Sequence, residues 1–352
     1  MSQLEYKGDW TLRPAESGNW STHKDFDPRY DPIKYLPDDN LVSAVNVALL
    51  LERPLLLTGD PGTGKTQLAS SLAWELGFPP PLVFSTKSTS NYKDIFYGFD
   101  AVGHFRQSQI RALDTHLSPD KRNVSVLDFI VWNALGKAIL LSNSQEKIGE
   151  LLDCKISETG NLRQVVLIDE VDKAPRDFPN DLLNEIERQS FEVPEFKNVS
   201  IAADRARRPI VVLTSNSERN LPDAFLRRCV FHHIAFPDGE RLIAILESHL
   251  GDFAKSRSGG LISEAISFFS YLRDDSKRSW EKKPATAELI DWLTVLKRRG
   301  ANPDVSLSGQ ESLNLGAISA LVKGVRDQPF VLERIKKADW KVPAKSGRDA
   351  RR

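Results

Sequence analysis

One glycine-rich segment constrains the fold of this chain more than any other feature, Gly59-Asp60-Pro61-Gly62-Thr63-Gly64-Lys65-Thr66. Its spacing, G-x-x-x-x-G-K-[ST], lets the backbone wrap closely around an anion, so that consecutive N–H groups point at it. The apolar run Leu55-Leu56-Leu57 precedes the segment and a helical pattern follows from Lys65. Strand, loop and helix N-terminus in this order predict a phosphate-binding loop. Lys65 is then expected to reach the β- and γ-phosphates of a nucleotide, and Thr66 to ligate Mg²⁺.

Short apolar runs alternate with helical stretches as far as residue 236. The expected strands are Pro54–Thr58, Pro81–Ser85, Val165–Ile168, Ile210–Thr214 and Val230–Phe236. The expected helices among them are Gly64–Leu76, Phe129–Leu141 and Phe178–Gln189. A further helix starts at Asp38 and ends at Glu52-Arg53-Pro54, because proline disfavours a helical residue before it. This alternation predicts an α/β fold, a parallel sheet with helices on both faces.

The strand signals stop at Pro237, and this divides the chain into regions. Residues 1–37 are expected to form an irregular aromatic arm, which packs either on its own body or on a neighbouring subunit. Residues 38–236 form the α/β nucleotide-binding domain. Residues 237–335 form a small all-α lid with four helices, near 238–250, 261–275, 286–300 and 312–326. Residues 336–352 form a basic tail.

Composition excludes several classes of protein. Lys plus Arg total 48 and Asp plus Glu total 48, which argues against a strongly basic nucleic-acid binder. Two cysteines cannot form a disulfide framework or a four-cysteine zinc site. The longest nearly apolar run, Leu41–Leu51, is far shorter than the about 20 residues of a membrane-spanning helix. We therefore expect a cytoplasmic protein with no membrane partner and no nucleic-acid partner.

Two acidic residues end the apolar run Val165–Ile168. Asp169 and Glu170 are placed at the carboxyl edge of the sheet, where α/β folds bind ligands. Asp169 is expected to hold Mg²⁺, and Glu170 to polarise the water that attacks the γ-phosphate. A charged pair after a strand is weak evidence alone, but about a hundred residues downstream of a phosphate loop it is a strong signal.

These segments resemble the AAA+ ATPases, and within them the MoxR branch. Pro54–Thr66 is similar to the entry strand and Walker A loop of that branch, and Leu167–Pro175 to its Walker B segment. Phe191–Val199 resembles the hairpin that precedes the strand called sensor 1. The resemblance covers residues 38 to 330 and implies that the chain binds ATP with Mg²⁺ and assembles as a ring, with six subunits expected.

The resemblance also implies roles for residues outside the two Walker segments. Asn216 follows the apolar run Val211–Leu213, as the polar residue of sensor 1 does. Arg228 stands at the place of the arginine finger, with Arg227 as the alternative; such a finger acts on ATP bound by the adjacent subunit. The lid arginine called sensor 2 is missing, and Lys283 could replace its charge although not its bidentate fork.

A MoxR-like ATPase is implied to remodel or activate a partner protein, and the resemblance points to a partner with a von Willebrand factor A domain. Two alternatives remain open at this point: the motor subunit of a nuclease or defence complex that acts on nucleic acid, and an ATP-gated scaffold with negligible turnover. Tyr97-Gly98-Phe99 and Trp132 lie in a segment that contributes to the central pore or partner surface in such proteins. These aromatic side chains either grip a polypeptide there or are buried.

Overall fold

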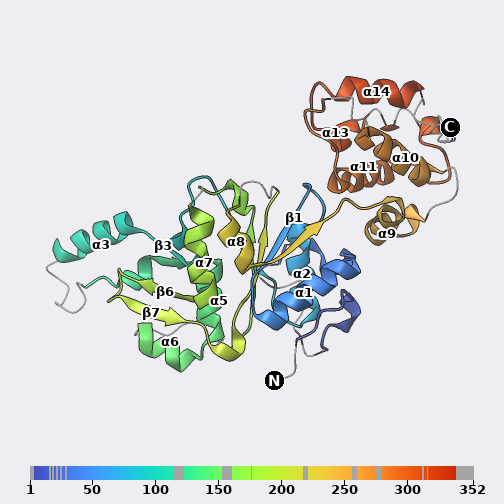
Figure 1. The fold of residues 1–352 in the computed structure, drawn as a ribbon. Coiled ribbons are helices and arrows are strands. Elements are labelled where there is room, and N and C mark those ends of the chain that lie inside the picture. Colours follow the sequence, from blue (N-terminus) through green and yellow to red (C-terminus); the bar gives the residue numbers. More distant parts are fainter. Residues whose placement is uncertain are drawn as a thin grey trace. The chain divides into compact units, whose positions relative to one another are not determined.

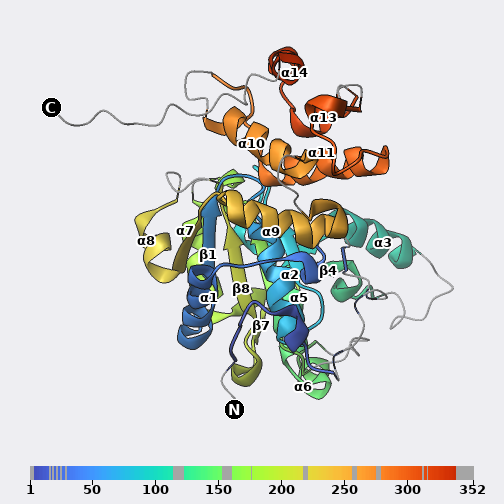
Figure 2. The same cartoon turned by 90° about the vertical axis from the view of Figure 1, so that its right-hand side faces the viewer.

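A computed structural model gives the fold of the chain (Figures 1 and 2). It describes residues 4–337 except 16, 18–19, 21–22, 24–25, 28–29, 114–122, 153–160, 176, 217–220, 256–259, 275–278, 311–312 and 315. The chain divides into two compact units, Met1–Gly59 with Gly64–Ile234, and Asp60–Thr63 with Ala235–Arg352. The expected basic tail lies, from residue 338 on, outside the described residues. Among the described helices, none has both the length and the apolar character needed to cross a membrane.

The first unit is built on a five-stranded parallel sheet with the order β2-β5-β8-β1-β9. Its strands are β1 (Leu55–Gly59), β2 (Leu82–Ser85), β5 (Val165–Asp169), β8 (Ile210–Thr214) and β9 (Val230–Ile234). Each coincides with an apolar run expected from the sequence, so the predicted α/β fold class is confirmed.

Helices cover both faces of this sheet, because successive side chains of a strand point to opposite faces. Leu56 of β1 and Leu213 of β8 belong to the core on one face, together with side chains of α5 and α7. Leu57 and Val212 belong to the core on the other face, together with side chains of α1 and α2. These helices are α1 (Asp39–Leu51), α2 (Lys65–Glu75), α5 (Ala134–Ser142) and α7 (Phe178–Arg188).

Two antiparallel sheets of two strands each lie on the α5 and α7 side of the unit (Figure 1). One pairs β3 (Tyr97–Phe99) with β4 (Ile130–Trp132). The other is a hairpin of β6 (Ser190–Val193) and β7 (Val199–Ala202), which confirms the hairpin expected at Phe191–Val199. The helix expected over Phe129–Leu141 is wrong at its start. Ile130-Val131-Trp132 are β-branched and aromatic residues that pair with β3, and α5 begins only at Ala134. The remaining helices are α3 (Ala101–Leu113), α6 (Gln145–Leu152) and α8 (Asp223–Arg228).

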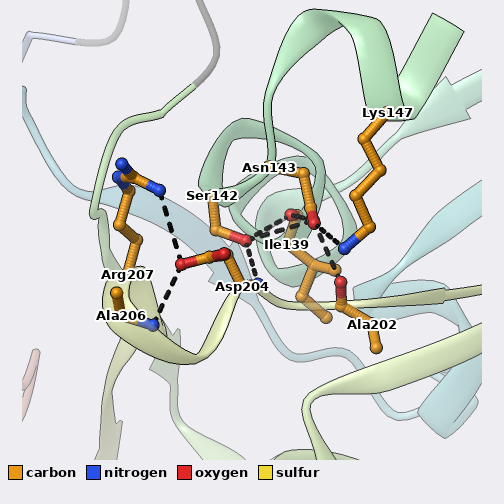
Figure 3. Close-up of polar contacts among 8 residues, drawn as sticks. All are labelled: Ile139, Ser142, Asn143, Lys147, Ala202, Asp204, Ala206 and Arg207. Carbon is orange, nitrogen blue, oxygen red and sulfur yellow. Dashed lines mark hydrogen bonds and ion pairs between the residues drawn. The ribbon is translucent and has the colours of Figure 1, made fainter.

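A buried polar network ties the end of α5 to the segment after β7 (Figure 3). Asn143 Nδ2 donates to the carbonyl of Ala202 at 2.9 Å, and Lys147 Nζ donates to Asn143 Oδ1 at 2.6 Å. Ser142 Oγ accepts from the backbone N–H of Asp204 at 3.0 Å. Ser142 and Asn143 are almost fully buried, so their hydrogen bonds hold the β6–β7 hairpin against the end of α5.

The aromatic side chains considered for a pore are largely packed inside the unit. Tyr97 is buried, its ring packs edge-to-face against Trp132, and its hydroxyl donates a hydrogen bond to Glu195 at 2.7 Å. Phe99 and Trp132 are partly buried against the same core. The structure therefore favours the buried alternative for these rings.

The N-terminal arm packs on its own chain. Tyr6 and Trp20 are buried in the core beside α1 and α2, and Tyr6 Oη lies 2.7 Å from Ser71 Oγ of α2. The backbone N–H of Lys7 donates to the carboxylate of Glu75, as does that of Asp9 at 2.8 Å. The arm is thus attached to the helix that follows the glycine loop.

The second unit is helical. Its helices are α9 (Gly239–Leu250), α10 (Leu261–Asp274), α11 (Thr286–Arg298), α13 (Ile318–Leu321) and α14 (Gln328–Lys337), packed around Leu246, Phe268 and Trp292. The first three coincide with expected helices. A single helix over 312–326 is wrong: in the described part of that range, helical residues 313–314 and the short α13 are separated by a turn at 316–317. Helix α14 follows, with Pro329 in its first turn. Proline is tolerated there because a first-turn N–H has no helical partner to lose.

Candidate nucleotide site

The glycine loop leads directly into the N-terminus of α2. Gly62 and Gly64 have φ values of 77° and 88°, a region that L side chains rarely adopt. Gly64 caps α2 and, as a glycine, supplies no side-chain hydrogen bond to the first turn. The first N–H groups of a helix without such a cap are suited to an anion, as is the positive end of its dipole. The side chain of Lys65 is almost fully buried and its Nζ donates to the carbonyl of Gly59 at 2.8 Å.

The end of β5 meets the start of α2 at Asp169. Thr66 Oγ1 donates to Asp169 Oδ1 at 3.1 Å, and Thr214 Oγ1 donates to the same oxygen at 2.5 Å. The structure therefore brings together Thr66 and Asp169, the two residues expected to hold Mg²⁺. A hydroxyl and a carboxylate are oxygen ligands of the kind Mg²⁺ prefers, usually one or two from protein with the rest from water and phosphate. The residues present fit this ion.

Glu170 adopts an uncommon backbone conformation directly after β5. Its φ of 58° and ψ of 51° lie in the left-handed region, which costs an L-residue roughly 1–2 kcal/mol. Its backbone N–H donates to Thr214 Oγ1 at 2.9 Å, which helps to hold this turn. The turn directs the carboxylate towards Asn216, whose Nδ2 lies 3.4 Å from Glu170 Oε1. The predicted Walker B and sensor 1 side chains are thus in contact.

Two further residues, Thr214 and Lys173, belong to this arrangement and were not predicted from the sequence. Lys173 forms an ion pair with Glu170, and this hydrogen bond raises the pKa of the lysine. Asp172 Oδ1 accepts the backbone N–H of Asn216 at 3.1 Å. The position of Thr214 at the carboxyl end of the sensor strand, two residues before Asn216, is the signal that could have pointed to it.

Arg228 lies near the end of α8, held by the neighbouring helix α7. Its Nη1 donates to Asn184 Oδ1 at 3.1 Å, and its Nε lies 3.7 Å from Glu187 Oε1. The Arg228 side chain is 41% exposed, so the guanidinium remains open to solvent while two partners limit its rotamers. Arg227, the alternative, is also exposed.

Lys283 lies in the second unit, where its Nζ donates to the carbonyl of Arg273 at 3.1 Å. Arg273, which the sequence pattern did not single out, lies beside it. Its guanidinium stacks on Phe236 at 3.6 Å from the ring centroid and donates to the carbonyl of Pro284 at 2.6 Å. Its Nη2 also donates to Asp60 Oδ2 at 2.7 Å, and residues 60–63 belong to this same compact unit. The second unit therefore contains an arginine, Arg273, with a bidentate guanidinium group, close to Lys283, the lysine that the sequence offered in place of the sensor 2 arginine.

The solved structures that are similar to this chain include two RuvB mutants from Thermotoga maritima. Each is 15% identical to this chain, with 81% of this chain and 70% of the other covered, at TM-scores of 0.42 and 0.41. A search of curated protein sequences finds no match. The family model for the ATPase family associated with various cellular activities, AAA, matches residues 55–238, more than half of the chain. That range contains the glycine loop, Asp169 and Glu170 at the end of β5, Asn216 and Arg228, and the chain belongs to the AAA family.

Proposed function

We propose that this chain is a MoxR-like ATPase that binds and hydrolyses Mg·ATP in an oligomeric ring to remodel or activate a partner protein. ATPase activity is a general property that the AAA family implies. One observation carries the hydrolytic part of the proposal: Thr66, Asp169, Thr214, Glu170 and Asn216 form one continuous set of hydrogen bonds at the carboxyl edge of the sheet.

In the proposed reaction, each side chain acts at a stated place on the nucleotide. The backbone N–H groups of the glycine loop and Lys65 bind the β- and γ-phosphates, and Thr66 and Asp169 hold Mg²⁺. The ion, when bound, neutralises charge on the phosphate oxygens. Glu170 orients and polarises the attacking water, and Asn216 fixes the Glu170 carboxylate through its Nδ2.

Lys173 restrains Glu170 in this arrangement. Its ammonium group pairs with Glu170 Oε2, while Oε1 faces Asn216. Because Lys173 occupies Oε2, a water there must displace the ammonium group before Glu170 can accept its proton. We propose that binding of Mg·ATP moves this lysine.

Substitution of two residues tests the ATPase proposal. Lys65→Ala removes the charge that binds the β- and γ-phosphates, so we expect loss of ATP binding in equilibrium titration. Glu170→Gln preserves the shape of the side chain but removes its basicity. We expect it to bind ATP and hydrolyse it at least about 100-fold more slowly. Glu240→Gln, an exposed glutamate in the first turn of α9, is the matched control. Wild-type turnover of Glu170→Gln would contradict the assigned role.

The ring is proposed from the exposed, oriented Arg228. A finger supplied to a neighbouring subunit contributes 10³–10⁵-fold in rate where it has been measured. Mixing wild-type protein with Arg228→Ala at increasing ratios should therefore depress activity more steeply than the wild-type fraction falls. Arg227→Ala is the matched control on the same helix. Activity proportional to the wild-type fraction in both mixtures would reject a shared site, and steep loss with Arg227→Ala alone would make Arg227 the finger.

The client is proposed from the family resemblance, as a protein with a von Willebrand factor A domain. Pull-down by the Glu170→Gln protein in ATP, with Lys65→Ala as the control that cannot bind nucleotide, tests this. Capture of such a domain only in the presence of ATP supports the proposal. ATP hydrolysis stimulated by DNA and abolished by moderate salt would instead favour the nucleic-acid motor.

A further inference from the structure

The tip of the glycine loop belongs to the second unit and not to the first. Residues Asp60–Thr63 cluster with the helical unit, whereas Gly59 and Gly64, on either side of them, belong to the unit that contains the sheet. The chain therefore passes from one unit to the other and back within the loop. The contacts that hold the tip in the helical unit also limit the conformation in which the loop meets a phosphate.

Two contacts hold the tip in the helical unit. Asp60 Oδ2 accepts a hydrogen bond from Arg273 Nη2 at 2.7 Å. Gly62 lies against the start of α11, where an added Cβ would be 2.9 Å from the Cβ of Ala285, closer than two such atoms come in proteins. Gly62 also has a φ of 77°, so both its backbone conformation and this close approach require glycine.

Arg273 is held in place independently of Asp60. Its guanidinium lies over the ring of Phe236, 3.6 Å from the centroid, and its Nη1 donates to the carbonyl of Pro284 at 2.6 Å. The side chain of Arg273 is 15% exposed, and that of Asp60 is 58% exposed. Most exposed ion pairs are weak because two mobile side chains must be ordered together. Here the arginine is already ordered by its other contacts, so Asp60 meets a fixed guanidinium.

The charge of Asp60 is adverse in a loop that binds an anion. Asp60 is the one charged residue of the sequence Asp60–Thr63. A carboxylate close to the phosphates repels them, and the effect is strongest where little water separates the charges. The guanidinium of Arg273 lies beside this carboxylate and offsets the repulsion. The ion pair therefore both attaches the tip and neutralises it.

We propose that Arg273 is a positioning residue for nucleotide binding, which acts on the glycine loop through Asp60 and not by touching the nucleotide. The ion pair holds the tip in the conformation that surrounds the β-phosphate, so that the shape of the loop depends on the helical unit. This inference rests on the proposed binding of ATP. Because ATP and ADP share the β-phosphate, the ion pair contributes equally to the binding of both.

A double-mutant cycle on Asp60→Asn and Arg273→Gln tests this role. Calorimetric titration measures the affinity for ADP and for the β,γ-imido analogue of ATP, which is hydrolysed slowly. In the Arg273→Gln background, Asp60→Asn removes only a negative charge and should strengthen binding of both nucleotides. In the wild-type background it also releases the tip, so we expect the gain to be at least about threefold smaller, or reversed. This difference should be the same for both nucleotides.

The matched control is Arg326→Gln, which removes an exposed ion pair with Glu281 in the same unit. The effect of Asp60→Asn on affinity should be the same with and without this substitution.

A second measurement needs no nucleotide and therefore separates this inference from the ATPase proposal. In protein labelled with ¹⁵N-glycine, the Gly62 amide is assigned by the loss of its signal in Gly62→Ala. Its order parameter in the wild type should be about 0.85, the value of rigid backbone. It should fall to one common lower value in Asp60→Asn, in Arg273→Gln and in the double variant, since each breaks the same ion pair.

Equal effects of Asp60→Asn in the two backgrounds, or a Gly62 amide that is equally rigid in all four proteins, would overturn the positioning role. A larger gain in the wild-type background, confined to the ATP analogue, would overturn it as well, because Arg273 would then leave Asp60 for the third phosphate. If Arg273→Gln does not fold by circular dichroism, Arg273→Lys replaces it, since one ammonium group cannot reproduce the fork that joins Pro284 and Asp60. If the wild type binds neither nucleotide, the ATPase proposal fails and the Gly62 measurement decides alone.

Discussion

Replacement of Thr214 by valine removes one hydroxyl that joins two parts of the nucleotide site. Thr214 is 1% exposed, and valine has nearly its shape and suits a central strand. The hydroxyl donates to Asp169 at 2.5 Å and accepts from the Glu170 N–H at 2.9 Å. A hydrogen bond to a charged group is worth about 1.5–3 kcal/mol, and a buried donor without a partner costs about 1–3 kcal/mol. Because both effects concern one oxygen, we expect a loss of about 2–4 kcal/mol.

Hydrogen exchange of the β5 and β8 amides, measured by mass spectrometry, reports this loss within the first unit. At 1.4 kcal/mol for each factor of ten, exchange should accelerate roughly 30- to 700-fold. The kcat for ATP should also fall at least about tenfold, because the left-handed turn that directs Glu170 loses one of its restraints. Thr214→Ser keeps the hydroxyl and should stay within about 1 kcal/mol of the wild type. If serine and valine have equal effects, or if valine changes exchange less than twofold, the reasoning is refuted.

Three further predictions concern other parts of the first unit. Tyr6→Phe and Ser71→Ala should each lower the free energy of unfolding, and a double-mutant cycle should show a coupling energy of about 0.5–1.5 kcal/mol. Additive effects would contradict a hydrogen bond between the N-terminal arm and α2. Burial raises the pKa of Cys229 to about 12, so in a Cys154→Ser background alkylation at pH 8 should be about 10³-fold slower than in urea, and similar rates would contradict this. Asn143→Ala should cost about 2–3 kcal/mol in urea unfolding, since it breaks bonds to two elements; a change under 0.5 kcal/mol would show the network to be dispensable.

Sequence patterns predicted the three inner strands of the central sheet because they are buried on both faces and therefore read as continuous apolar runs. Val165–Ile168 and Ile210–Thr214 are of this kind, and the structure pairs them in parallel. The glycine loop was equally clear, since its spacing is fixed by the anion that it surrounds. In contrast, the pattern at Ile130–Trp132 predicts the start of a helix rather than β4, because a three-residue strand has too few residues to show a period.

Side-chain contacts of the candidate site could be predicted only in part. The meeting of Thr66 with Asp169 follows from parallel strands that end at one edge. The ion pair of Lys173 with Glu170 does not, because it depends on the left-handed turn at Glu170. Arg273 was missed for a related reason: it lies in the last turn of α10, and only the packing of the second unit brings its guanidinium to Phe236 and Asp60.

Helix α3 has a consequence for the temperature response of this protein. It has 13 residues, none of them buried, and Val102, Phe105, Ile110 and Leu113 are exposed. Near its start, the His104 ring packs at 5.4–5.8 Å from two phenylalanine rings, Phe99 and Phe129. A helix of this length without tertiary burial is marginal in water. We therefore expect α3 to lose its helical structure on warming from the Leu113 end towards His104, well before the sheet unfolds, so that the first loss of circular dichroism signal comes from this helix alone.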